Sequence, residues 1–150
     1  MAAVRSVSLP DLSATERLAA SLAGLARRGD AILLQGPLGA GKSALARAFL
    51  RAAAGDPGLD VPSPTFTLVQ TYQTALGPVH HFDLWRLDGP IALAELGWDE
   101  ACDDIVLVEW PERLGELWPD DALTITLVLG EGEARSATLA GWPDRIGQIA

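Results

Sequence analysis

One eight-residue segment constrains the fold of this 150-residue chain more than any other: Gly36-Pro-Leu-Gly-Ala-Gly-Lys-Ser43. It matches the pattern G-x-x-x-x-G-K-[ST], a glycine-rich loop that connects a strand to a helix and holds phosphate groups. The flanking sequence fits, because residues 31–35 are an apolar run typical of a buried strand and residues 44–54 have helical character up to Gly55. The segment therefore predicts a phosphate-binding loop, and an ordinary glycine turn is the alternative.

The residue types in this loop follow from phosphate chemistry. Glycines adopt backbone angles that other residues avoid and let amide groups approach a phosphate closely. Lys42 would reach the β and γ phosphates, and the Ser43 hydroxyl would ligate Mg²⁺. Lys42 is also the only lysine in the chain, beside ten arginines. Because lysine is a compact point charge and arginine a planar fork, this single lysine indicates a geometric role, with codon bias as the alternative.

A second metal ligand is expected at the carboxyl end of a neighbouring strand, where P-loop enzymes usually place an acid. Residues 105–108 are typical of a buried strand, and Glu109 follows them directly. We interpret Glu109 as a metal ligand in preference to a surface residue. Asp83 ends another expected strand and either lies at the same edge or only caps a turn.

Four other positions have less specific signals. Thr65 follows the loop by about twenty residues, where switch proteins often place a hydroxyl that senses the γ-phosphate, but a helix cap or turn fits equally well. His80 and His81 are adjacent, so on a strand they face opposite sides and cannot share one metal ion, and strand packing is the better interpretation of both. Trp110 either packs near the nucleotide or fills the core.

The remaining pattern predicts one α/β domain over residues 1–150. Strands alternate with helices, and this favours a P-loop-type three-layer sandwich with a mixed, mostly parallel sheet and antiparallel edge strands. The other expected elements are a helix over 14–28 that begins with a Ser13/Glu16 capping box, strands over 66–72 and 79–84, one or two short helices over 91–103, and a hairpin of 123–129 with 135–139.

Composition limits the possible partners. The net charge is −9 and the pI is about 4.5, which disfavours unaided DNA or RNA binding. Residues 83–121 hold twelve acidic residues and two arginines, which form either a solvated surface or a face for a basic partner or cation. The longest apolar runs are far shorter than the ~20 residues of a membrane span. The lone Cys102 allows no internal disulfide, and with no apparent secretory signal we expect a cytoplasmic protein.

Taken together, the motifs resemble the TsaE family, small bacterial P-loop ATPases of tRNA threonylcarbamoyladenosine biosynthesis. The segments that carry the resemblance are, in order, 33–43, 63–69 (SPTFTLV), 81–87 (HFDLWRL) and 107–110 (LVEW). The resemblance extends from Leu9 to about Leu139. It implies an assembly with a TsaD-type transferase and its TsaB-type paralogue, in which ATP hydrolysis resets the complex between turnovers and tRNA is contacted only indirectly.

The resemblance also implies roles for individual residues. Lys42 would act on the phosphates, Ser43 and Glu109 would hold Mg²⁺, Thr65 would belong to a switch segment, and Asp83 would belong to a segment linked to hydrolysis. The residues expected to bind ATP are Thr15, Gly36, Pro37, Leu38, Gly39, Ala40, Gly41, Lys42, Ser43, Ala44 and Arg135. The chain departs from the family pattern at three positions, Ser43 for threonine, Trp85 for tyrosine and Pro37 for a frequent acidic residue.

Two other functions compete with this interpretation. A small-molecule kinase would bring lid arginines to the transferred phosphoryl group, and the acidic stretch supplies only Arg86 and Arg113. A nucleotide-gated binding module would bind ATP with negligible turnover. Phosphate release with and without the two partners separates these functions.

Overall fold

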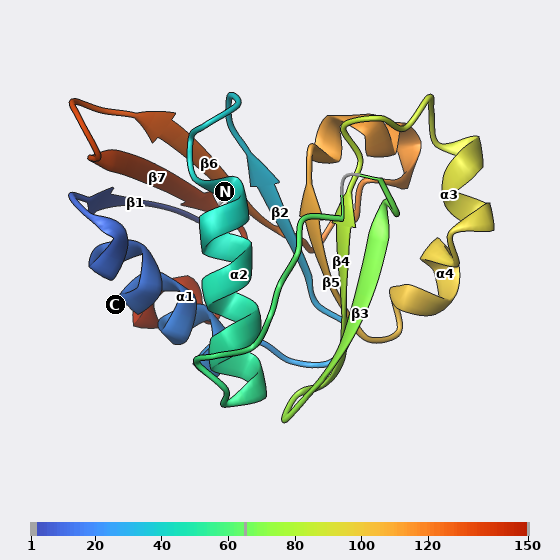
Figure 1. Cartoon of the computed structure of the whole chain (residues 1–150), viewed down its shortest axis with the longest axis horizontal. Coiled ribbons are helices and arrows are strands. Elements are labelled where there is room, and N and C mark those ends of the chain that lie inside the picture. Colours follow the sequence, from blue (N-terminus) through green and yellow to red (C-terminus); the bar gives the residue numbers. More distant parts are fainter. Residues whose placement is uncertain (1–2, 65, 150) are drawn as a thin grey trace.

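The computed structural model describes residues 3–64 and 66–149. Helices and strands alternate along most of the chain (Figure 1). The elements are, in order, β1 (Val4–Leu9), α1 (Leu12–Leu25), β2 (Ala31–Gln35), α2 (Lys42–Ala54), β3 (Val69–Thr74), β4 (Gly77–Asp83), α3 (Ile91–Glu95), α4 (Trp98–Ala101), β5 (Ile105–Glu109), η1 (Pro111–Leu117), β6 (Leu123–Leu129), β7 (Arg135–Ala140) and η2 (Ile146–Gln148).

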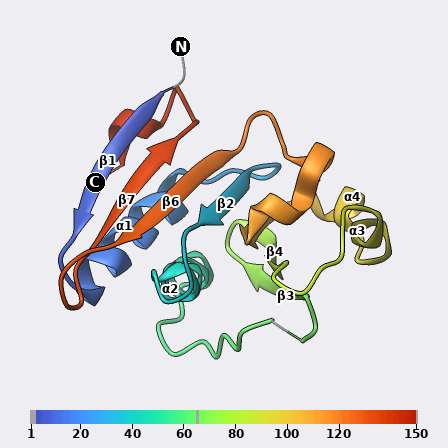
Figure 2. The ribbon, with the colours of Figure 1, turned by 90° about the horizontal axis from the view of Figure 1, so that it is seen from above.

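The strands form one seven-stranded sheet in the order β1-β7-β6-β2-β5-β4-β3. The pairs of β2 with β5, β2 with β6 and β4 with β5 are parallel, while the three outer pairs are antiparallel. Figure 2 shows α1 and α2 along one face of the sheet, with α3, α4 and η1 on the other. This architecture confirms the expected three-layer α/β sandwich with a mixed sheet that is parallel at its centre.

The central strands are apolar on both faces because helices cover both. Along β2, Ile32 and Leu34 belong to the cluster that α1 and α2 cover, while Leu33 belongs to the opposite cluster. From α2, Phe49 and Leu50 complete the first cluster with at most 1% of their surface exposed. Full burial of such a side chain contributes about 1.5–3 kcal/mol, so these contacts fix α2 firmly against the sheet.

The start of α1 differs from the expectation. Its N-cap is Asp11, whose Oδ1 accepts a hydrogen bond from the backbone N–H of Ala14 at 2.9 Å, and the Ser13/Glu16 capping box is wrong. The helix also ends at Leu25 and not at residue 28. Both short aspartate and serine side chains favour an N-cap, so sequence spacing alone did not distinguish the two.

Two other boundaries also differ. The edge strand β1 was not predicted, although Val7 and Leu9 alternate with serines as an edge strand requires. The strand expected over 66–72 begins only at Val69, because Leu68 has φ 69°, a left-handed conformation that a strand does not contain.

Among the described residues, none of the helices is long and apolar enough to cross a membrane.

The loop after β2 requires glycine at its first position. Gly36 has φ 146°, and a Cβ atom there would lie 2.7 Å from the backbone oxygen of Leu127 on β6. Gly39 also has a positive φ of 82°, but a Cβ there would meet no atom within 4 Å. Gly36 therefore lets the loop leave the sheet in close contact with the neighbouring strand.

We expect Gly36→Ala to lower the free energy of unfolding by about 1–3 kcal/mol, because backbone strain and a clash with β6 act together. Gly39→Ala is the matched control and should cost only about 1 kcal/mol, since it introduces strain without a clash. Urea unfolding monitored by circular dichroism measures both. Equal losses in the two variants would contradict the close packing of Gly36 against β6.

Candidate functional site

A cavity of about 440 Å³ opens where β2, β4 and β5 end and α2 begins. Ligands in open α/β sheets bind at this position, outside the carboxyl ends of the strands. The residues that line it come from the glycine-rich loop, the segment before β3 and the ends of β4 and β5, namely Leu38, Gly39, Gly41, Lys42, Ser43, Ala44, Ser63, Asp83, Trp85, Glu109 and Trp110.

The ammonium group of Lys42 is enclosed by its own loop and by an aromatic ring. Nζ donates hydrogen bonds to the carbonyl oxygens of Gly36 (2.5 Å) and Pro37 (3.0 Å), and it lies 3.9 Å from the ring centroid of Trp110. Only 5% of the residue is exposed. Burial lowers the pKa of Lys42, and the nearby carboxylates, Glu109 first, oppose this shift.

Two side chains from different elements hold Glu109, which is itself 2% exposed. The Ser43 hydroxyl, in the first turn of α2, donates to Oε1 at 2.9 Å. His81, on the adjacent strand β4, lies with Nε2 2.7 Å from Oε2. The carboxylate therefore joins the loop helix to two parallel strands of the sheet.

Asp83 lies beside Glu109, because the two residues are partners in the parallel register of β4 and β5. It is 5% exposed, and its Oδ1 accepts a hydrogen bond from the backbone N–H of Trp85 at 3.1 Å. Its own N–H donates to the carbonyl oxygen of Leu68 at 2.9 Å. The end of β4 is thus tied to the segment that precedes β3.

The other predicted residues that the structure describes do not line the cavity. The carbonyl groups of Gly36 and Pro37 accept hydrogen bonds from Lys42, and Ala40 is fully buried. Arg135 on β7 reaches the loop, with Nη2 3.4 Å from the carbonyl oxygen of Gly39. Thr15 is buried on α1, and it is not one of the described residues that line the cavity. Thr65 lies outside the described residues.

The donor set fits Mg²⁺ bound together with a phosphate ligand. The Ser43 hydroxyl and the Glu109 carboxylate supply two hard oxygen ligands 2.9 Å apart. Mg²⁺ is usually held by one or two protein groups together with substrate phosphates and water. Within residues 3–64 and 66–149, no cluster of three or more His, Cys, Asp or Glu side chains forms an all-protein metal site.

Comparison with known proteins decides the family. A family model for threonylcarbamoyl adenosine biosynthesis protein TsaE matches residues 9–137. The chain belongs to the TsaE family. The expected resemblance is confirmed, and the family and the P-loop fold both point to a nucleotide-binding protein of tRNA threonylcarbamoyladenosine biosynthesis.

Individual TsaE relatives agree with this assignment. The chain is 37% identical over 121 residues to the TsaE protein of Rickettsia felis. This match covers 79% of this chain and 70% of the relative. It is 30% identical over 135 residues to the TsaE protein of Bacillus subtilis, and this match covers 87% of this chain and 82% of the relative. The crystal structure of Bacillus subtilis YdiB superposes with a TM-score of 0.79 at 25% identity and covers 99% of this chain and 93% of the other.

Sequence reasoning missed two contacts in this TsaE site. His81 was interpreted as strand packing, yet it binds Glu109. Trp110, for which two interpretations stayed open, covers Lys42 and packs on Trp85 with ring centroids 4.4 Å apart. The alternation along β4 correctly placed His80 and His81 on opposite faces.

Cys102 packs at the edge of the core, where burial raises its pKa to about 11.

Because Lys42 is the only lysine, amine labelling reports directly on the site. We expect acetic anhydride to label Lys42 about tenfold more slowly in the native chain than in urea, since the amine must first leave its enclosure. Trp110→Ala should accelerate labelling of the native chain, whereas Trp118→Ala, a tryptophan outside the cavity lining, should not. Mass spectrometry of the peptide that contains Lys42 measures the rate of labelling. Native labelling as fast as in urea would contradict the enclosed lysine.

Proposed function

We propose that this chain binds and hydrolyses ATP with Mg²⁺ as a subunit of the complex that forms threonylcarbamoyladenosine in tRNA, and that turnover resets the transferase between cycles. The observation that carries the proposal is the 2.9 Å contact between Ser43 and Glu109 beside the buried amine of Lys42. P-loop proteins that hydrolyse nucleotides combine these three groups, a lysine for phosphate and two oxygen ligands for the metal.

The side chains have distinct roles in this proposal. The ammonium group of Lys42 exchanges the carbonyls of Gly36 and Pro37 for phosphate oxygens, and the Ser43 hydroxyl and the Glu109 carboxylate hold the cation. When bound there, the cation would supply positive charge to neutralise the phosphate oxygens. Asp83, at the same sheet edge, positions the attacking water or the switch segment that contains Thr65.

Nucleotide contacts farther from the phosphates come from the loop and from Arg135. The glycine-rich loop lines the cavity at the N-terminus of α2, where backbone amides and the helix dipole favour an anion. Arg135 lies against the loop at Gly39, close enough to meet the nucleotide at the rim. Thr15 contributes from α1 only if the helix or the loop shifts, since it is buried away from the cavity lining.

The partners we propose are a TsaD-type transferase and its TsaB-type paralogue. A chain with a net charge of −9 does not attract tRNA by itself, so contact with the machinery runs through protein and the tRNA is reached indirectly. Nine of the twelve acidic residues in 83–121 are exposed, and they supply an electrostatic surface for a basic partner. We propose the cytoplasm as the location of this activity, because its proposed substrate complex contains tRNA.

Phosphate release from ATP, with and without the two partner subunits, tests the proposed function. We expect slow release by the chain alone and faster release in the assembled complex. Release that requires an added small-molecule acceptor would instead indicate a kinase. Absence of release under every condition, despite nucleotide binding, would indicate a binding module and overturn the hydrolytic role.

Two substitutions should separate metal binding from turnover. Glu109→Gln should raise the Mg²⁺ concentration needed for half-maximal phosphate release about tenfold or more, because a neutral amide is a poorer ligand for a hard cation. Asp83→Asn should slow turnover about 10²-fold while nucleotide affinity stays within a few-fold of the parent. Magnesium titrations of phosphate release measure the metal requirement and the turnover rate, and nucleotide titrations measure the affinity. Identical titrations for the parent and Glu109→Gln would exclude the metal role of Glu109.

The partner surface can be tested by charge reversal. Asp99, Glu100 and Asp103 are exposed within the acidic stretch, so their triple change to lysine should weaken association with the transferase heterodimer about tenfold at 0.1 M salt and flatten its salt dependence. Reversal of three exposed carboxylates elsewhere, at Glu16, Glu131 and Asp144, is the control. Equal effects of the two triple changes, or tight binding of free tRNA by the isolated chain, would contradict this surface.

A further inference from the structure

His81 is a buried histidine at a position where an apolar residue would ordinarily complete the core. It is 2% exposed and lies on β4 between Val79 and Asp83, on the face that α2 covers. Its register partner on β5 is Leu107, two residues before Glu109. Burial of a polar ring is costly unless its polar atoms are satisfied, so the contacts of this ring indicate what it does.

The ring uses one nitrogen to contact the carboxylate. Nε2 lies 2.7 Å from Glu109 Oε2, and because a carboxylate only accepts hydrogen bonds, Nε2 carries the proton. Nδ1 is buried and has no hydrogen-bond partner among residues 3–64 and 66–149. Nε2 is therefore the ring nitrogen through which His81 acts on the carboxylate.

The contacts of Glu109 complete the geometry. Each carboxylate oxygen accepts one protein donor, Oε1 from Ser43 and Oε2 from His81. The Ser43 contact connects Glu109 to the loop, while the His81 contact connects it to the adjacent parallel strand β4. Without His81, the terminal carboxylate torsion of Glu109 would be restrained at only one of its two oxygens.

We infer that His81 is a positioning residue, which orients the Glu109 carboxylate for a divalent cation by donating a hydrogen bond from Nε2 to Oε2. The inference rests on the proposed function, since it gives Glu109 a metal to hold. Groups that hydrogen-bond a metal ligand in this way fix its orientation, and their loss typically lowers metal affinity about 10–100-fold. His81 itself does not touch the cation.

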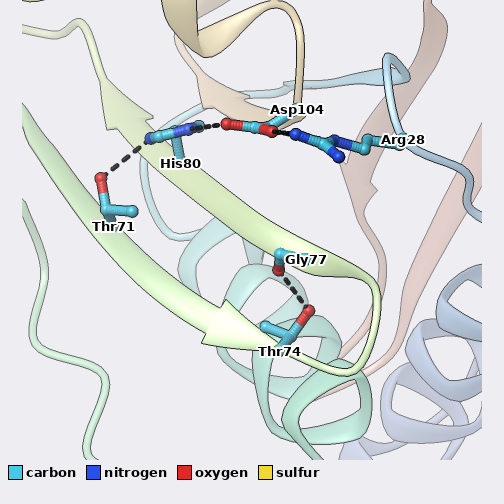
Figure 3. Close-up of polar contacts among 6 residues, drawn as sticks. All are labelled: Arg28, Thr71, Thr74, Gly77, His80 and Asp104. Carbon is cyan, nitrogen blue, oxygen red and sulfur yellow. Dashed lines mark hydrogen bonds and ion pairs between the residues drawn. The ribbon is translucent and has the colours of Figure 1, made fainter.

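The neighbouring histidine provides a control within the same strand. His80 faces the other side of the sheet, where Nδ1 lies 2.9 Å from Thr71 Oγ1 and Nε2 lies 3.0 Å from Asp104 Oδ2 (Figure 3). Asp104 also pairs with Arg28 at 3.1 Å (Figure 3), and none of these four residues lines the cavity. Substitution of His80 therefore perturbs β4 and a histidine–carboxylate pair without touching the cavity.

The experiment measures binding of Mn²⁺, a paramagnetic substitute for Mg²⁺, to the full chain saturated with ADP, by electron paramagnetic resonance. Three variants are compared with the parent, His81→Leu, His81→Gln and His80→Leu. Glutamine places an amide donor close to the position of the histidine Nε2, whereas leucine fills similar space without a donor. Metal-free ADP affinity and thermal unfolding are measured for each variant.

We expect His81→Leu to bind Mn²⁺ about 10–100-fold more weakly than the parent, with His81→Gln restoring affinity to within a few-fold. His80→Leu should leave Mn²⁺ affinity unchanged, and metal-free ADP affinity should be similar throughout. Should His81→Leu fail to fold, His81→Asn replaces it, because its amide is too short to reach Glu109 and should show the same loss.

Parental Mn²⁺ affinity in a folded variant that lacks the donor would overturn the role of His81. Equal losses in His81→Gln and His81→Leu would also overturn it, because they would indicate a packing role. Failure of the parent to bind ADP or Mn²⁺ is a different result, which contradicts the proposed function and is visible before any variant is compared.

Discussion

The hydrogen bond between the Ser43 hydroxyl and the Glu109 carboxylate is the interaction on which the rest of the site depends. It joins the first turn of α2 to the end of the central strand β5 at 2.9 Å. A carboxylate that is 2% exposed is tolerated only when donors satisfy it, and Ser43 and His81 provide them from two directions. The sheet, the loop helix and the candidate metal site are therefore organised around a single buried acid.

The ammonium group of Lys42 is enclosed by neighbouring groups of the site. Its ammonium group is held by two loop carbonyls and covered by Trp110, which has φ 59° immediately after β5. A phosphate ligand must replace these contacts, so part of its interaction energy is offset by the contacts that it breaks. Trp110 follows Glu109 directly, so the ring that covers the lysine and the buried acid come from consecutive residues at the end of β5.

The sequence predicted those parts of the site that depend on local geometry. The glycine pattern identified the loop, and the position of Glu109 after an apolar strand placed it at the correct edge. Strand alternation placed His80 and His81 on opposite faces but did not give the partner of His81, because His81 and Glu109 lie 28 residues apart in the sequence. The contact of Trp110 with Lys42 could not be predicted from the sequence either, because it depends on a left-handed backbone conformation at Trp110.

We propose that this site binds a magnesium–nucleotide complex through Lys42. Isothermal titration of the full chain with a non-hydrolysable ATP analogue and Mg²⁺ tests it most directly, with Lys42→Ala as the comparison. We expect saturable binding to one site per chain in the parent and binding at least about 10²-fold weaker in a folded Lys42→Ala variant. Equal affinity of the parent and the folded variant would contradict it.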